Sequence, residues 1–183
     1  MAHSKTILFI IGSASLNSAN EKLVNIIIQL LNPLIQVEVF KDLKNLPHFE
    51  PEQSSDHPSE AIKEFRSRVE RADGVIFSTP EYVFSIPAGL KNALEWCVAT
   101  TIFSDKPVGV ITASAQGQKG HEELQMIMQT LGAELKDETS LLVQGIKGKI
   151  NSGGEVTDAK TKEELSDFVK AFSELLVSRT DRS

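Results

Sequence analysis

The residues most suggestive of chemistry lie in one stretch, residues 77–96. An apolar run at residues 74–77 is typical of a buried strand, and the chain then bends at Pro80 and Pro87 into a segment with helical spacing. A strand that ends in a polar loop and continues as a helix is how an open α/β sheet builds a ligand crevice. The loop carries no nucleophile–base pair. It is suited to hold a flat, polar group by its backbone, which indicates a cofactor that supplies its own chemistry.

A second polar loop, residues 12–20, directly precedes a helix and contains Ser13, Ser15, Asn17, Ser18 and Asn20. Hydroxyl and N–H groups at a helix N-terminus form an anion site, helped by the helix dipole. The alternative is that Ser18 or Asn20 caps the helix without any ligand. A third loop, residues 114–120, is rich in Gly, Gln and Ser.

Alternating strands and helices must position these loops. Hydrophobic periodicity predicts strands at residues 6–11, 35–40, 74–79, 108–113 and 139–143, and helices at 20–31, 59–72, 86–99, 121–135 and 161–177. Such alternation predicts a parallel sheet with helices on both faces. The fingerprint G-x-G-x-x-G is absent after the first strand, which favours a flavodoxin-like three-layer sandwich with strand order 2-1-3-4-5 over half of a dinucleotide-binding fold. In that order, the loops after strands one, three and four share one edge of the sheet.

Composition excludes several classes of protein. The 183 residues suit a single domain, residues 1–183, with a polar tail at about 178–183. The net charge of -6, from 19 basic and 25 acidic groups, disfavours a nucleic-acid partner. The apolar run at residues 7–11 is too short for a signal or a membrane span, so we expect a cytoplasmic protein without a membrane partner. No residues have metal-ligand spacing, and the single cysteine, Cys97, is expected to be buried and inert.

Two loops resemble the NAD(P)H-dependent FMN reductase family. Residues 12–20, GSASLNSAN, resemble its phosphate loop G-S-x-R-x-x-S-x-N, and residues 80–96 resemble its P-E-Y-N-x-S-x-P-G-x-L-K-N-A-x-D-W. Residues 114–120 stand where the family has a third, glycine-rich flavin loop. The resemblance covers nearly the whole chain. The family includes FMN reductases, azoreductases, quinone reductases and chromate reductases, which are usually dimers or tetramers.

The resemblance implies which residues hold FMN. Ser13, Ser18 and Asn20 would bind its phosphate, and residues 81–84 would line the isoalloxazine ring, largely through backbone groups. The expected cofactor-binding set is Ser13, Ser15, Asn17, Ser18, Ala19, Asn20, Pro80, Glu81, Tyr82, Val83, Phe84, Ser85, Ser114 and Gly117. Two positions depart from the family pattern: Ser15 replaces an arginine and Val83 replaces an asparagine.

The function expected from the resemblance is that of an FMN-dependent NAD(P)H oxidoreductase. NADPH or NADH would reduce bound FMN, and a small acceptor (free flavin, quinone, azo compound or chromate) would then be reduced in a ping-pong scheme without a catalytic acid, base or nucleophile. A homodimer or homotetramer is expected, with residues 46–58 and the third helix as candidate contacts. The alternatives are a flavodoxin-like electron carrier and a scaffold that has lost FMN.

Three single residues have plain structural interpretations beside the functional ones. Trp96 is expected in the core or at a subunit interface. His121 is expected as a polar residue at a helix start, with contact to substrate as the alternative. Tyr82 either stacks near the flavin or anchors its loop.

Overall fold

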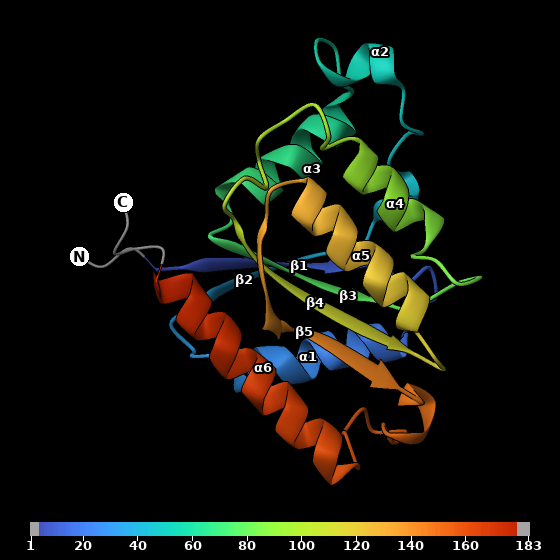
Figure 1. Cartoon of the computed structure of the whole chain (residues 1–183), viewed down its shortest axis with the longest axis vertical. Helices are drawn as coiled ribbons and strands as arrows, with labels where there is room; N and C mark the ends of the chain where they lie inside the picture. Colours follow the sequence, from blue (N-terminus) through green and yellow to red (C-terminus); the bar gives the residue numbers. More distant parts are fainter. Residues whose placement is uncertain (1–3, 179–183) are drawn as a thin grey trace.

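Five parallel strands form the centre of the computed structural model, which describes residues 4–178 (Figure 1). They are β1 (Thr6–Ile11), β2 (Gln36–Phe40), β3 (Gly74–Thr79), β4 (Pro107–Ser114) and β5 (Glu134–Gln144). Their order in the sheet is β2-β1-β3-β4-β5, which confirms the predicted flavodoxin-like arrangement. The winding reverses beside β1, so a ligand crevice is expected at the carboxyl ends of β1 and its neighbours.

Helices cover both faces of this sheet (Figure 1). One face carries α1 (Ala19–Leu30) and α6 (Ala159–Ser178), and the other carries α3 (Glu60–Arg71), α4 (Ala88–Glu95) and α5 (Gln118–Thr130). Along β1, Leu8 and Ile10 pack toward α3 and α4, whereas Ile7, Phe9 and Ile11 pack toward α1 and α6. Both faces of a central parallel strand are buried, which explains its unbroken apolar sequence.

The largest difference from the predicted elements lies between α5 and β5. The predicted helix extends to Leu135, but α5 ends at Thr130 and β5 begins at Glu134 rather than Thr139. Gly132 has a φ of +76°, and Ala133 donates its N–H to the Met128 carbonyl at 3.0 Å. These features form a Schellman motif, which ends a helix at a left-handed glycine. Gly132 is a sequence signal for this helix end. The first half of the strand was not predicted, because residues 136–138 are polar and interrupt its apolar pattern.

The segment at residues 46–58, a candidate subunit contact in the sequence analysis, contains the short helix α2 (Pro51–Ser54) and follows η1 (Leu43–Asn45). Its first part is fixed to α4, because Asn92 and Trp96 each donate a side-chain hydrogen bond of 2.9 Å to the Pro47 carbonyl. Asn92 also accepts a bond of 2.8 Å from the Phe49 N–H. Trp96 itself is buried in the core. This part of the loop is therefore held by its own chain.

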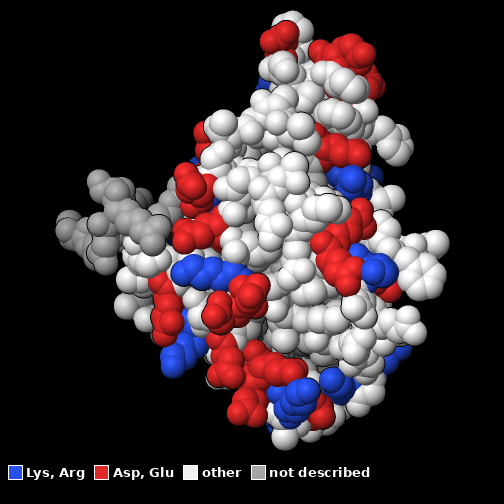
Figure 2. All heavy atoms as spheres, in the orientation of Figure 1, with Lys and Arg blue, Asp and Glu red and all other residues white. Residues whose placement is uncertain are grey.

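The surface agrees with the weakly acidic composition. Figure 2 shows basic side chains singly or beside acidic ones over the face that it presents. Within residues 4–178, no helix is both long enough and apolar enough to span a membrane.

Candidate functional site

The loops after β1, β3 and β4 meet at the carboxyl edge of the sheet, where they surround a cavity of about 590 Å³. A fourth segment, which follows β5 and includes η2 (Ile146–Gly148), closes one side. The expected residues that line the cavity are Ser13, Ser15, Asn17, Ser18, Ala19, Asn20, Pro80, Glu81, Tyr82 and Ser114. Lining residues that the sequence analysis missed are Leu16, Lys22, Ala113, Ala115, Ile146, Lys147 and Ile150. Val83, Phe84, Ser85 and Gly117 lie outside this lining.

The loop after β1 combines a helix cap with free backbone donors. Ser18 is the N-cap of α1, and its Oγ accepts from the Glu21 N–H at 3.1 Å. The Ser13 hydroxyl accepts from the Ser15 N–H at 3.2 Å. Among the described residues, the N–H groups of Leu16 and Asn17 have no hydrogen-bond acceptor. The loop can therefore offer N–H donors to an anion at the positive end of the helix dipole.

Asn20 ties this loop to the sheet. Its side chain is buried, its Nδ2 donates to the Ala113 carbonyl at 3.1 Å, and its Oδ1 accepts from the Ser78 hydroxyl at 3.1 Å. Ala113 lies in β4 and Ser78 in β3. The first turn of α1 is thus fixed against the ends of two strands, which holds the loop in place. Capping by Asn20, the alternative considered from the sequence, is not what the structure shows, because Ser18 performs it.

The loop after β3 forms a tight hairpin. Tyr82 and Ser85 exchange backbone hydrogen bonds of 2.9 and 3.1 Å, and the residues between them, Val83 and Phe84, have φ values of +52° and +59°. Two consecutive left-handed residues are typical of a type I′ turn, which favours Asn and Gly. The β-branched Val83 is strained there, and its side chain is 94% exposed. The asparagine that the family pattern has at this position therefore suits the backbone conformation.

We predict that Val83→Asn raises the free energy of unfolding by about 1 kcal/mol, because asparagine adopts the left-handed conformation at lower cost. Urea denaturation measures the change. Val98→Asn is the matched control, since Val98 is also exposed and has no positive φ. A similar gain in both variants, or none in Val83→Asn, would show that the turn is not strained.

Two carboxylates fasten the hairpin to α5. Glu81 accepts from the N–H groups of Gly117 at 3.3 Å and Gly120 at 2.9 Å, at the start of that helix. Glu123 accepts from the Ser85 hydroxyl at 2.6 Å and from the Ile86 N–H at 2.9 Å. Glu81 therefore caps a helix with its side chain, and Glu123, which the sequence analysis missed, orients the other end of the hairpin. The cap formed by Glu81 also explains why α5 begins at Gln118 rather than at the predicted His121.

Tyr82 lies between two cavities. It lines the cavity described above, and also a neighbouring cavity of about 390 Å³ that is bounded by residues 41–44 and the start of α4. Its hydroxyl lies 3.5 Å from the Ser13 hydroxyl. Burial raises the pKa of this phenol, but hydrogen bonds with Ser13, Ser15 and the Ala14 backbone outweigh that effect, so the pKa is lowered. Tyr82 thus anchors its loop to the loop after β1.

A family model described as NADPH-dependent FMN reductase matches residues 6–143, which include all three loops. The chain belongs to this family. The chain is accordingly an NAD(P)H-dependent oxidoreductase with FMN as cofactor. The cavity fits that group, because it combines free N–H donors at a helix N-terminus with hydroxyl groups and space of about 590 Å³.

Curated relatives and solved structures agree with the family. The chain is 31% identical over 171 residues to the NADH:(hydroxy)cinnamate reductase subunit CrdA of Vibrio ruber, covering 90% of this chain and 84% of that protein. It is 25% identical over 183 residues to a quinone reductase of Escherichia coli, covering 96% and 97%. The structure of FerB, an NAD(P)H:(acceptor) oxidoreductase from Paracoccus denitrificans, is similar with a TM-score of 0.82 and 27% identity, over 95% of this chain and 98% of that one.

His121 is a structural residue in this member of the family. It is buried in the first turn of α5, with Nδ1 at 2.9 Å from the Thr112 hydroxyl and Nε2 at 3.1 Å from the Ser140 hydroxyl. It does not line the cavity. Burial lowers the pKa of the imidazole, and the charge of Glu122 only partly opposes this.

We predict that the free energy of unfolding decreases as the pH is lowered below about 6.5, the ordinary pKa of histidine. In that range the histidine of the unfolded chain binds a proton, whereas the buried His121 of the folded chain stays neutral. The stability contributed by the neutral ring is complete above that pH and is lost as the pH falls toward the lowered folded pKa. Urea unfolding between pH 5 and 8 tests this in comparison with His121→Gln, which removes the titration. Equal pH slopes in both proteins would contradict it.

Cys97 is a buried thiol. Burial raises the pKa of the Cys97 thiol to about 12, which keeps it in the unreactive protonated form. Within residues 4–178, no group of three or more His, Cys, Asp or Glu side chains could hold a metal ion.

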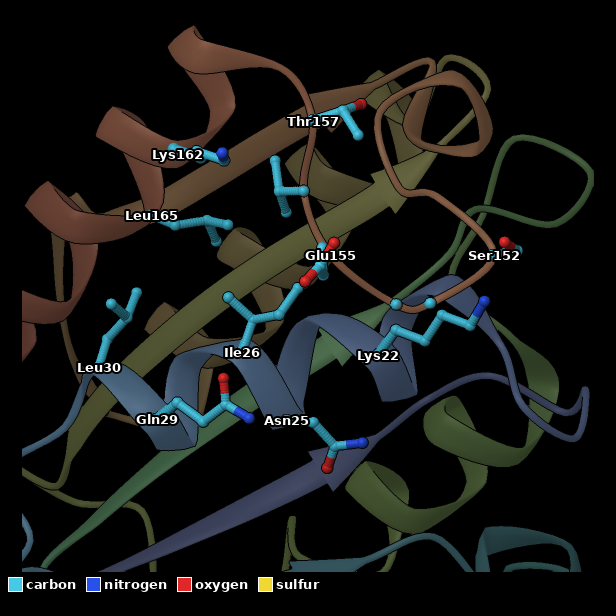
Figure 3. Close-up of a pocket in the computed structure, with 13 residues that line it drawn as sticks. Lys22, Asn25, Ile26, Gln29, Leu30, Ser152, Glu155, Thr157, Lys162 and Leu165 are labelled. Carbon is cyan, nitrogen blue, oxygen red and sulfur yellow. The ribbon is translucent and has the colours of Figure 1, made fainter.

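A larger cavity of about 1030 Å³ adjoins the site (Figure 3). It lies between α1, α6 and the loop at residues 152–157, and was not anticipated from the sequence. Lys22 is shared by the two cavities. In Figure 3 its side chain runs from α1 toward the N-terminal end of that helix, away from Gln29 and Leu30.

Proposed function

We propose that this FMN-dependent enzyme transfers the electrons of NADPH or NADH to a small acceptor, most simply a quinone, in a ping-pong scheme. The observation that supports this is the cavity at the sheet edge, which has backbone donors and hydroxyl groups but no paired acid and base. Bound FMN would supply the chemistry, accepting a hydride from the nicotinamide and passing the electrons on. The quinone is suggested by the relatives named quinone reductase and 2-hydroxy-1,4-benzoquinone reductase.

In this proposal the protein binds and orients its ligands. The loop at residues 13–18 and the start of α1 would hold the FMN phosphate, while the backbone of residues 81–84 would contact the ring system. Glu81 and Glu123 keep that backbone in one conformation through their bonds to Gly120 and Ile86. Rigid N–H donors beside the ring would steady the negative charge of the reduced cofactor. Ser85 and Gly117 act through this scaffold.

Exposed apolar side chains lie on the hairpin and in the loop after β1. Leu16 is 89% exposed, Phe84 is 71% exposed and Tyr82 is 39% exposed. We propose that this surface receives the aromatic acceptor and is partly covered by a second copy of the chain in a homodimer. Sedimentation equilibrium of the purified protein measures the assembly; a dimer is expected, and a monomer at all concentrations would contradict that part of the proposal.

The absorbance spectrum of the purified protein, with and without added FMN, tests the central proposal. A flavin band is expected that bleaches on anaerobic addition of NADPH or NADH and returns on addition of benzoquinone. Initial rates at several fixed quinone concentrations should give parallel double-reciprocal lines. A flavin band that pyridine nucleotides bleach only over hours would instead favour the electron carrier, and a protein that binds no FMN would favour the scaffold.

A further inference from the structure

The loop expected to hold the FMN phosphate has no cationic side chain. Residues 13–20 are Ser, Ala, Ser, Leu, Asn, Ser, Ala and Asn, and the arginine of the family pattern is Ser15. A phosphate monoester carries a charge of about -1.5 to -2 near neutral pH, and charge-assisted hydrogen bonds are its strongest contacts. The backbone N–H groups and the dipole of α1 supply only partial positive charge. Any cationic side chain that contacts the phosphate therefore comes from another part of the chain.

Two lysines line the cavity from elements outside this loop. Lys22 is in the first turn of α1, where its N–H donates to the Ser18 carbonyl at 3.1 Å. Lys147 lies in η2, which follows β5. Figure 3 shows the Lys22 side chain directed toward the N-terminal end of α1, which directly follows the loop at residues 13–18. Neither lysine forms an ion pair with any residue from 4 to 178.

The acidic groups near the cavity are already engaged. Glu81 is the acidic residue among the lining side chains, and its carboxylate accepts from the N–H groups of Gly117 and Gly120. Glu21, beside Lys22 in the sequence, pairs with Lys41 at 3.1 Å. The cavity therefore has two lysines without an ion pair among the described residues, and one carboxylate whose oxygens accept backbone N–H groups, an arrangement that favours an anion.

We infer that Lys22 and Lys147 are the cationic partners of the FMN phosphate in this chain. They take the place of the arginine that the family pattern has at the position of Ser15. This inference rests on FMN occupying the cavity, as proposed above. The two lysines come from different elements, one from α1 and one from the segment after β5. They are 125 positions apart in the sequence (147 minus 22), so no local motif could contain them.

Comparison of FMN with riboflavin, which lacks the phosphate, tests the inference in the full-length protein. Fluorescence titration of Lys22→Ala/Lys147→Ala should show FMN binding at least about tenfold weaker, because two charge-assisted contacts are lost. Riboflavin binding should change by less than about twofold, since the ring and ribityl contacts remain. Added salt should weaken FMN binding by the unmodified protein more than by the double variant. Lys162→Ala is the control, because Lys162 lines only the larger cavity.

A rescue variant separates a charge effect from damage to the fold. Ser15→Arg placed in the double variant returns a cation to the loop and should restore most of the FMN affinity. Equal weakening of FMN and riboflavin, or unchanged FMN binding in a double variant with the original melting temperature, would overturn the inference. An unmodified protein that binds neither flavin would instead refute the proposed function itself.

Discussion

Gly12→Ala is expected to lower the free energy of unfolding by about 3 kcal/mol, the upper range for forced overpacking of a core. A Cβ atom at this position would lie 2.4 Å from the Thr79 Oγ1 and 2.8 Å from the Thr79 Cβ. Neither atom can withdraw easily, because Thr79 is fully buried and its hydroxyl donates to the Pro80 carbonyl. Gly12 also donates its N–H to the Ser78 carbonyl at 2.9 Å, which couples β1 to β3 where both strands end.

Urea denaturation of Gly12→Ala measures this loss, and Gly89→Ala is its matched control. A Cβ at Gly89 would meet its nearest neighbour, the Leu43 Cβ, at an ordinary 3.5 Å, and the position lies within α4. Alanine is favoured over glycine in a helix by about 1 kcal/mol, so this variant should be as stable as the unmodified protein or more so. If Gly12→Ala lowered the free energy of unfolding no more than Gly89→Ala does, the close approach between Gly12 and Thr79 would be disproved.

Asn20→Ala is expected to lower the free energy of unfolding by about 2–3 kcal/mol and to weaken FMN binding with it. The substitution removes the hydrogen bonds to the Ala113 carbonyl and the Ser78 hydroxyl, both in a buried environment. Buried polar groups left without partners carry the full cost of their desolvation. Because these bonds fix the first turn of α1 against the sheet, their loss also loosens the N–H donors of residues 16–17.

Chemical denaturation and FMN titration are measured together, with Asn25→Ala as the control on the same helix. Asn25 is exposed, so its replacement tests the intrinsic helix preference of alanine without the buried contacts. The control should match the unmodified protein in both measurements. Equal stability of the two variants would mean that the Asn20 amide contributes nothing in the fold, and unchanged FMN affinity in a destabilised Asn20→Ala would separate this residue from the site.

The central strands β1 and β3 could be predicted because helices bury them on both faces. The bounds of β1 and β3 agree with the apolar runs at residues 6–11 and 74–79. The alternation of strands and helices predicted a parallel sheet, and the missing G-x-G-x-x-G fingerprint favoured the observed strand order. β5 was predicted in part only. Its first half is polar because it extends along the edge of the sheet, and it pairs with Pro107 and Val108 before a register shift. Edge pairing of this kind leaves little hydrophobic pattern in a sequence.

The sequence by itself determined the sheet, its order, the family and the three loops that meet at its carboxyl edge, because hydrophobic periodicity and short motifs are local properties of the chain. Only the tertiary structure decided which side chains hold those loops and which charges face them. Glu123 reaches the hairpin from α5, the Asn20 amide joins two strands, and Lys147 arrives from beyond β5. These contacts join residues far apart in the chain, and their hydrogen-bonding and charge preferences select no particular partner until folding has brought the elements together.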